Sequence, residues 1–558
     1  MTPRALLSRA SATLLSALAL ACAAPSDEVG NSTTGGTLVV VAPAEPRSLL
    51  PAIGEASQAA PILASLYERL ADIGPTLETA GDAGFTPRLA TRWQWSSDSL
   101  SLAFTLDSTA RWHDGHRVSA HDVRFTFRVY TSDSVATDQG SLVSNIDSVA
   151  VVDSSTAVFW FKRRSPQQFY DATYHMYIMP AHRLDSIPLG RLAESPLARD
   201  PVGTGRFRFA RWDAQQRIEI VADTTHPKGR PYLDRVIFSI APDFGAATIK
   251  LFAGEADLLE NIKPENLAQV ARTPTLRVVD NPAMQYRFLG FNLRDPRNPT
   301  QPHPLFGDVR VRRALSMAVD RERVVRNAYD SLGLVALAPA PRALIPDTTA
   351  FTGLPFDLAR ARALLDSAGW TDSDNDGVRD RNGVKLAFDI LAPNSSPAAQ
   401  RLTVLLQAQF KAVGANATPQ LLEINSLSER VDERRFDTYT GGWLSSPGLV
   451  GMRQTWTSTG DGNAVRYRNP VFDAAVDSAL TTFDRAASRR HWAQAFQQIL
   501  DDAPAIWLAE PRVFMALHRR FIVPPTRPDG WYTNLAEWRV DPAQRIDRDR
   551  IGLGGAAR

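Results

Sequence analysis

The segment from Tyr439 to Ser446 carries side chains that could hold an organic ligand without transforming it. Polar and apolar residues alternate up to Gly441 and Gly442, and Trp443 follows directly. Glycines let a ligand approach the backbone closely, and an indole offers a flat apolar wall with one hydrogen-bond donor. The alternative is that Trp443 is a core residue behind a strand.

Four residues elsewhere are candidates for the same ligand site. Glu45 lies in an early loop, and Met284, Tyr286 and Arg287 lie on an apolar stretch near the middle of the chain. Each has an alternative role, because a charged loop residue is commonly just solvated and an apolar one commonly packs in the core.

Two other segments have the residue types of metal sites. The first contains His113, Asp114, His116, His121 and Asp122. Its spacing differs from that of known zinc motifs, so we expect these residues to serve a turn and a helix start instead.

The second such segment, residues 372–380, has oxygen-bearing side chains at positions 1, 3, 5 and 9 of a calcium-loop pattern, with glycine at position 6. Position 12 is Gly383, however, where a calcium loop needs a bidentate glutamate. We therefore expect a hairpin here and predict no metal site in the chain.

Motifs of catalysis are missing from the sequence. There is no Gly-x-Ser-x-Gly elbow, no Gly-x-x-x-x-Gly-Lys loop and no His-Glu-x-x-His pair. We predict no catalytic residue and no cofactor. A secreted hydrolase with two carboxylates in a Trp-lined cleft stays the alternative, because an active site can be assembled from distant residues.

The composition fits a large globular protein with a neutral balance of charge. The chain has 558 residues, 44% of them hydrophobic, and a formal net charge of +2. That balance gives no reason to expect nucleic acid as a partner. Twelve Trp and 25 Phe are enough to line a cleft as well as fill a core.

The first 22 residues have the pattern of a secretory signal peptide. Arg4 and Arg9 precede an apolar run that ends at Ala21, and Cys22 follows as the single cysteine. The run resembles a bacterial lipobox, in which Cys22 would be lipidated; ordinary cleavage without lipidation is the alternative. Residues 23–36 would then be a tether. No second apolar run is long enough to span a membrane.

Residues 100–130 show how the chain forms its elements. Leu100 to Leu106 alternate as in a strand, and Asp114-Gly115 is a turn signal. Ser119 with Asp122 has the spacing of a capping box, which predicts a helix. Alternating apolar residues from Val123 to Val129 alone would favour a strand.

Similar reasoning predicts the other elements. Residues 37–41 read as a buried strand, 56–72 as a helix, 207–209 as part of a strand after two glycines, and 472–502 as two helices. A second strand, 504–508, is expected to return to the first lobe. The predicted helix caps are Asp308, Asp320, Asp357 and Ser488.

These blocks, spread in order over residues 37–540, resemble the family of extracytoplasmic solute-binding proteins that serve peptide and nickel importers. The resemblance implies an α/β fold, a two-lobe clamshell of the type II periplasmic-binding-protein class with an extra subdomain in the first lobe. The implied division is a lobe I base of residues 37–60, 200–280 and 505–558, an extra subdomain of residues 61–199, and a lobe II of residues 281–504.

The resemblance also implies a function. The chain would be a monomeric receptor in the periplasm or cell envelope, anchored through a lipid, that closes around a ligand and delivers it to an ABC permease and ATPase. A peptide is the expected ligand; an oligosaccharide, an opine or a metal chelate are the alternatives within the family.

One departure from the family pattern concerns the ligand. In the family, the tryptophan at the place of Trp443 lines the cavity, and an aspartate shortly after it pairs with the amino terminus of a bound peptide. This chain has Ser445 and Ser446 there. A hydroxyl accepts a hydrogen bond but cannot neutralise an ammonium group. Asp461, on a following loop, is a candidate substitute.

Overall fold

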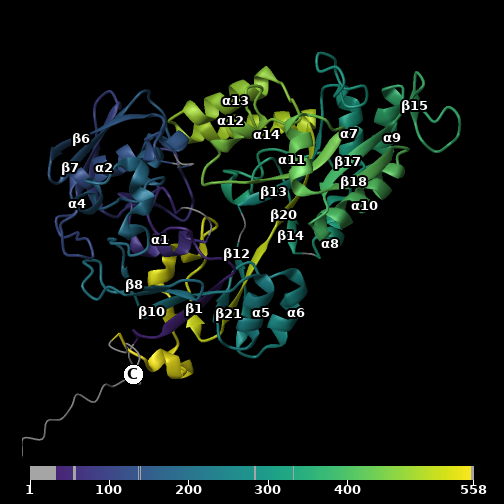
Figure 1. Ribbon diagram of the computed structural model, residues 1–558. Helices are drawn as coiled ribbons and strands as arrows, with labels where there is room; N and C mark the ends of the chain where they lie inside the picture. Colours follow the sequence, from purple (N-terminus) through teal and green to yellow (C-terminus); the bar gives the residue numbers. More distant parts are fainter. Residues whose placement is uncertain are drawn as a thin grey trace, which may run out of the picture.

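The computed structural model of the chain describes residues 33–54, 58–135, 137, 140–281, 284–330 and 332–553. These residues form two lobes of mixed α/β structure, which lie side by side in Figure 1. We call residues 33–281 and 513–553 the first lobe, and residues 284–511 the second lobe. The predicted signal peptide, Cys22 and most of the predicted tether lie outside the described residues.

The base of the first lobe is a seven-stranded sheet in the order β12-β21-β11-β1-β10-β9-β8. Strand β1 lies in its middle, parallel to β10 and β11, and its first five residues are buried, as predicted for residues 37–41. The strands are β1 Thr37–Ala42, β8 Phe207–Asp213, β9 Arg217–Ala222, β10 Arg235–Ile240, β11 Leu258–Leu259, β12 Leu276–Asn281 and β21 Val513–His518.

Helices and short segments complete this base. They are α1 Ala60–Leu66, α5 Phe244–Phe252, α6 Pro264–Arg272, the short strands β22 Phe521–Ile522 and β23 Arg539–Val540, and the 3₁₀ helices η5 Trp531–Glu537, η6 Pro542–Gln544 and η7 Asp547–Arg550. The end of the predicted tether is part of this fold, because the backbone N–H of Gly35 donates to the carbonyl of Tyr232 at 2.7 Å.

The extra subdomain of the first lobe contains a four-stranded antiparallel sheet in the order β4-β5-β7-β6. Its strands and those of a neighbouring two-stranded sheet are β2 Ala71–Ile73, β3 Phe85–Pro87, β4 Ala90–Trp95, β5 Ser101–Leu106, β6 Ile146–Asp153 and β7 Thr156–Phe161. Its helices are α2 Ala120–Tyr130, α3 Gln168–Thr173, α4 Ala181–Leu184, η1 Gly140–Val143, η2 Leu189–Glu194 and η3 Pro196–Ala198.

Helix α2 resolves the conflict between the capping signal and the alternation. The Asp122 carboxylate accepts a hydrogen bond from the Ser119 N–H at 2.7 Å, and the capping box is present. The alternating residues from Val123 to Val129 are all buried, because α2 contacts β6, β7 and α4 and so has apolar surroundings on several sides. The predicted helix is confirmed.

The second lobe is built on a six-stranded mixed sheet in the order β14-β20-β13-β19-β17-β18. Its strands, with those of a small hairpin, are β13 Gln285–Phe291, β14 Gly333–Val335, β15 Asp380–Arg381, β16 Val384–Lys385, β17 Ala387–Pro393, β18 Asn416–Leu422, β19 Thr438–Leu444 and β20 Ala505–Pro511. Its helices are α7 Val309–Met317, α8 Arg321–Ala328, η4 Arg342–Leu344, α9 Leu358–Ser367, α10 Pro397–Lys411, α11 Ile424–Asp432, α12 Gly451–Trp456, α13 Pro470–Thr481 and α14 Arg485–Asp502.

Three of the four predicted helix caps in this lobe are confirmed. Asp308, Asp320 and Asp357 each accept a backbone hydrogen bond at the start of a helix. The cap predicted at Ser488 is wrong: Asp484 caps α14 through the Ala487 N–H at 2.6 Å, and the Ser488 hydroxyl donates to a carbonyl of α13.

The chain passes between the lobes twice, and the two passages lie side by side. β12 leads into β13, and β20 leads into β21 through Arg512. β12 and β21 pair in the first lobe while β13 and β20 pair in the second; the yellow ribbon in Figure 1 runs from one lobe to the other. The strand predicted at 504–508 to return to the first lobe therefore belongs to the second sheet, and the return begins at β21.

Gly203 and Gly205 precede β8 and lie against the end of α1. A Cβ atom at Gly203 would lie 1.9 Å from the Leu66 carbonyl oxygen, and one at Gly205 would lie 2.2 Å from that of Ser65. The glycines therefore let this segment press against the end of α1, which is shorter than the predicted helix 56–72 and packs against β8 and η5. Residues 55–57 lie outside the described part.

Candidate functional site

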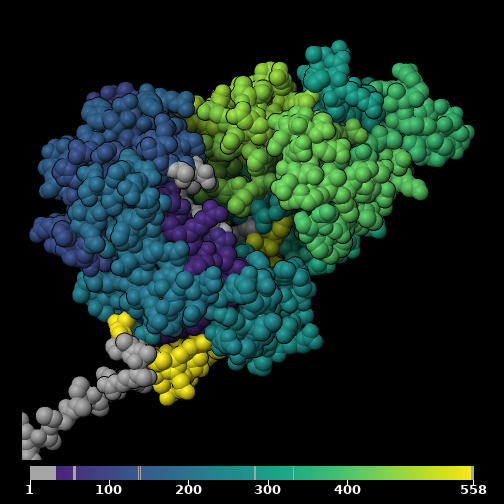
Figure 2. Space-filling model, viewed as in Figure 1, coloured from purple at the N-terminus to yellow at the C-terminus, as the bar shows by residue number. Residues whose placement is uncertain are grey.

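The molecule is hollowed between its two lobes. Figure 2 shows this hollow between the blue and the green parts, with the purple start of the described chain in its floor. A cavity of about 290 Å³ is lined from both sides. Its first-lobe residues are Thr76, Leu77, Glu78, Thr79, Ala80 and Gln167, and its second-lobe residues include Leu344, Ile345, Gly448, Leu449, Phe483, Arg485 and Trp492.

Buried apolar residues of both lobes belong to one cluster, and three further contacts join the lobes at the rim of this cavity. The Arg485 guanidinium donates to the Ala80 carbonyl at 3.4 Å, and the guanidinium of Arg164 lies 4.9 Å from the ring centre of Phe483. Gly448, with φ of +85°, lies so close to Thr79 that a Cβ on it would be 3.3 Å from the Thr79 Cβ. We call these three contacts the rim; sequence reasoning missed all of them, because each joins segments hundreds of residues apart.

The ladder between β13 and β19 brings most of the predicted ligand residues together. Tyr286 pairs with Trp443, and Arg287 pairs with Gly442. Beyond the paired residues, the Ser445 N–H donates to the Met284 carbonyl at 2.6 Å. The two segments nominated from sequence are thus neighbours in one sheet.

Gly441 and Gly442 make room for the chain's own side chains. A Cβ at Gly441 would lie 2.6 Å from Phe288 Cζ, and one at Gly442 would lie 2.0 Å from the Arg287 guanidinium. The Arg287 side chain folds over Gly442 and donates to Gln285 at 2.8 Å. The need for glycine here is therefore explained without a ligand.

Tyr286 and Tyr439 belong to a buried aromatic cluster of the second lobe. The Tyr286 hydroxyl accepts from Trp456 Nε1 at 2.8 Å, and the Tyr439 ring packs edge-on against Phe288. Burial raises the pKa of both phenols well above the usual value. Trp443 is half-buried, with its ring edge against Gly462. Of these aromatic residues, Trp443 has the most surface left for a ligand.

Glu45 is held by the first lobe. Its carboxylate accepts hydrogen bonds from Trp212 Nε1 at 2.5 Å and from the Gln215 N–H at 3.1 Å. The Arg199 guanidinium stacks on the Trp212 ring at 3.9 Å and completes the group. These partners account for the carboxylate, and a role for Glu45 in ligand binding stays a prediction.

The segment after Trp443 is the most open part of the candidate site. Leu444 has 81% of its surface exposed, Ser445 is half-buried and Ser446 is exposed. Asp461 is exposed as well, and its backbone carbonyl accepts from Arg434. Neither Ser445 nor Ser446 is replaced by an acidic residue, as the sequence already shows.

Glu510 is a titratable residue of this region that sequence reasoning missed. It lies at the end of β20, has 6% of its surface exposed, and accepts from the Arg342 N–H at 2.8 Å. Its other carboxylate oxygen has no hydrogen-bond partner among the described residues. Burial raises the pKa of Glu510 to about 7, against the lowering effect of Arg342. The sequence did carry one signal for Glu510, which is a single acidic residue within an apolar strand.

The calcium-like segment already contains a cation. The Lys385 ammonium lies 2.7 Å from Asp374, 2.9 Å from Asp376 and 3.7 Å from Asp380. An ammonium there supplies the positive charge that the carboxylates need.

The predicted turn around Asp114 also has protein partners. Asp114 accepts from the His116 N–H at 3.2 Å and contacts His182 at 2.8 Å and Arg183 at 3.3 Å. The rings of His116 and His182 stack with centres 4.2 Å apart. These hydrogen bonds give the histidines and Asp114 a role in joining the turn to α4.

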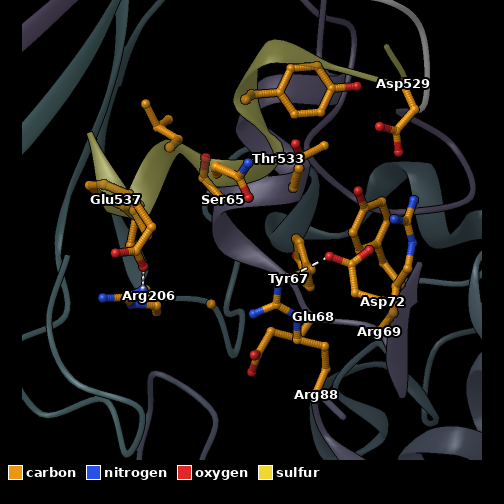
Figure 3. A pocket seen from close by; sticks show the side chains of 18 of the residues that line it. Ser65, Tyr67, Glu68, Arg69, Asp72, Arg88, Arg206, Asp529, Thr533 and Glu537 are labelled. Atoms are coloured by element: carbon orange, nitrogen blue, oxygen red, sulfur yellow. Dashed lines mark hydrogen bonds and ion pairs between the residues drawn. The ribbon is translucent and has the colours of Figure 1, made fainter. Parts of the chain in front are cut away.

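A second cavity, of about 140 Å³, lies inside the first lobe between α1 and η5 (Figure 3). Its charged side chains pair with one another. Arg88 donates to Asp72 at 3.1 Å, Arg206 pairs with Glu537, and the Arg69 guanidinium lies against Tyr174 and Tyr177. Two of the arginines are thus paired with carboxylates, and the third packs on aromatic rings.

The comparison with family models gives one match that covers most of the chain. Residues 84–464 match the model described as bacterial extracellular solute-binding proteins, family 5 middle. The oligopeptide-binding protein AppA of Bacillus subtilis is 27% identical over 446 residues, which are 79% of this chain and 80% of that protein. The heme-binding protein A of Haemophilus influenzae is 26% identical over 504 residues, 84% of this chain and 86% of that one.

A solved structure agrees in fold. The structure of AppA from Bacillus subtilis in complex with a nonapeptide aligns with a TM-score of 0.69 at 26% identity, and the alignment covers 91% of this chain and all of that one. The predicted two-lobe fold with an extra subdomain is confirmed. The chain belongs to family 5 of the bacterial extracellular solute-binding proteins, the receptors of ABC transporters, which bind their solutes and do not transform them.

Proposed function

We propose that this receptor captures a peptide by closing its two lobes over it and then delivers the peptide to a membrane permease. The cavity lined by both lobes is the observation that carries the proposal, and none of the ligand residues nominated from sequence is among its lining residues. Two adjacent passages of the chain between the lobes would act as the hinge, since a few residues at element ends can absorb the change in backbone angles.

The ligand would lie against the open end of β19. The half-buried ring of Trp443 would cover one face of the ligand, and the backbone after it, with Ser445 and Ser446, would hydrogen-bond to peptide groups. Water could fill space around the ligand side chains at small cost, so that different sequences are accepted. Met284, Tyr286, Arg287, Tyr439, Gly441 and Gly442 would support this wall from behind.

The two serines bear on which peptides are bound. Without an acid after Trp443, a charged amino terminus placed there would lose the partner that neutralises it. We therefore expect affinity to depend little on a free amino terminus. The relatives support a peptide ligand through AppA, whereas the heme-binding relative makes heme the ligand to exclude.

The rest of the assignment concerns location. We propose a monomer in the cell envelope, with Cys22 lipidated and the following residues as a tether. The lobe I base and the extra subdomain would move together as one body, and lobe II, which includes β20, would move as the other.

Native mass spectrometry of protein purified from its host, followed by thermal unfolding with candidate ligands, tests the proposal. A co-purified peptide, and a rise in unfolding temperature with that peptide and with its N-acetylated form, are expected. A bound ligand at about 100 times its Kd stabilises the fold by about 2.7 kcal/mol. If hemin or nickel–histidine stabilised the fold and no peptide did, the peptide assignment would be wrong.

A further inference from the structure

Four arginines surround a cavity of about 490 Å³ at the end of the second lobe that is opposite the candidate ligand site. Arg294 follows β13, Arg434 precedes β19, and Arg466 and Arg468 lie between α12 and α13. Since β13 and β19 are antiparallel, these ends meet. About 20 Å of strand separates them from Met284 and Ser445.

No carboxylate neutralises this group, which we call the arginine cluster. Among the described residues, none of its four members forms an ion pair with an acid. Arg434 donates to the carbonyls of Val431, Asp432 and Asp461, and Arg294 to that of Thr300. Backbone carbonyls position the guanidinium groups but leave their charge uncompensated.

The acids that flank the cluster in sequence are engaged elsewhere or face solvent. Asp295, next to Arg294, accepts from the Arg297 N–H at 2.9 Å, and Glu433, next to Arg434, pairs with Arg435. Asp437 pairs with His303 at 3.2 Å, and Asp473 accepts from the Ser458 N–H at 3.0 Å. Asp432 and Asp461 are exposed. The arginines thus repel one another: burial, with the neighbouring charges of Arg434 and Arg294, lowers the pKa of Arg466.

Arg466 is the member best placed to receive a ligand. Its Nη1 is buried without a hydrogen-bond partner, and its side chain makes no hydrogen bond or ion pair within the described chain. Arg466 and Arg434 both have positive φ, 59° and 61°, a conformation that costs energy in a non-glycine residue. An uncompensated charge and an unpartnered donor at one cavity are the features that point to an external anionic partner.

We propose that the arginine cluster is a second binding site of this receptor, separate from the interlobe site, and that it takes a phosphate-bearing anion. Guanidinium groups match phosphate oxygens in pairs, and several of them around one anion give charge-assisted hydrogen bonds. The phosphate can belong to a small soluble molecule or to a lipid headgroup, and the two sources share this chemistry.

Calorimetry with inorganic pyrophosphate tests the soluble source. Saturable binding to the wild type is expected, at an ionic strength matched with sodium chloride. Arg466→Gln and Arg468→Gln should each weaken it about tenfold or more. Arg468 is exposed and makes no ion pair, so its variant keeps the fold even if the Arg466 variant does not. Arg360→Gln, which removes an exposed charge from α9, is the matched control and should bind as the wild type does.

Flotation with vesicles tests the lipid source. Binding to phosphatidylglycerol vesicles, lost in Arg466→Gln and kept in Arg360→Gln, with no heat from pyrophosphate, assigns the site to a lipid headgroup. The proposal is overturned if neither probe binds, or if the three variants lose binding equally. Because the interlobe ligand is not used, these outcomes are independent of whether the receptor takes peptides.

Discussion

The two places where the lobes meet are built in opposite ways. At the hinge, two covalent passages of the chain lie side by side, and the strands on both ends of them are paired within their own sheets. Asp280 and Arg512 form an ion pair there. At the rim, the specific contacts between the lobes are a carbonyl hydrogen bond, a cation–π contact and the approach of Gly448 to Thr79.

This difference explains how one chain can be both stable and mobile. The hinge cannot separate because the chain itself runs through it twice, whereas the three rim contacts are each weak. Buried apolar residues of both lobes, Leu77 and Leu449 among them, also belong to one cluster. Exposed cation–π pairs are worth about 0.5–1 kcal/mol, which is within reach of the binding free energy of one ligand. The cavity lies beside the weak side, so a ligand there can decide whether the rim closes.

Trp443→Ala tests the proposed ligand contact at the open end of β19 and has the largest expected effect. The ligand-induced stabilisation, about 2.7 kcal/mol for the wild type at 100 times Kd, should disappear. The unliganded variant should unfold within a few degrees of the unliganded wild type, because Trp443 is only half-buried. Thermal unfolding with and without the co-purified ligand measures both. Equal ligand stabilisation in variant and wild type would remove Trp443 from the site.

Glu510→Gln tests the hinge side through the pH dependence of the free energy of unfolding. The folded chain holds the Glu510 proton up to a pKa of about 7, and the unfolded chain loses it near 4.5. Between these values only the folded state binds the proton, so wild-type stability falls as pH rises. The variant should lack this loss and be about 2 kcal/mol more stable relative to wild type at pH 7.5 than at pH 4.5.

Urea unfolding at several pH values measures this dependence. Glu265→Gln, which replaces an exposed glutamate, is the control and should follow the wild type. If Glu510→Gln followed the wild type too, the burial effect at Glu510 would be refuted.

Phe483→Ala tests the rim and should have the smallest effect. Removing the ring that Arg164 contacts should weaken the closed state by about 0.5–1 kcal/mol, which lowers ligand affinity about two- to fivefold. Phe356→Ala removes an equally exposed ring, with 50% of its surface exposed against 49% for Phe483, and should leave affinity unchanged. Calorimetric titration with the ligand compares them. The same affinity for Phe483→Ala and wild type would show that the rim does not resist opening.

Local chemistry was predictable from the sequence, and contacts across the chain were not. The capping box of Ser119 with Asp122 and the cap at Asp357 depend on residues three apart, so a short segment contains all the information. Ser488 was misassigned because Asp484 competes for the same helix start and wins. Which of two polar residues four positions apart caps a helix depends on where the preceding helix ends.

The candidate site was only partly predictable. Alternation around Gly441 and Gly442 identified a strand of the site, but two of the side chains that fill the space above these glycines, Phe288 and Arg287, come from β13. The arginine cluster likewise joins residues from distant segments. Sequence spacing carries no sign of such meetings, because the folding of the sheet creates them.

The most direct measurement of lobe closure uses the short approach at the rim. A Cβ on Gly448 would be 3.3 Å from the Thr79 Cβ, slightly below the roughly 3.5–4.5 Å of a disulfide, and a cysteine there would have to adopt the φ of +85°. In a chain with Cys22→Ser, the pair Thr79→Cys and Gly448→Cys should trap a preloaded ligand once oxidised. We expect ligand release to slow by at least about a hundredfold and to recover on reduction. Release at one and the same rate from the oxidised and the reduced protein would contradict closure over the ligand.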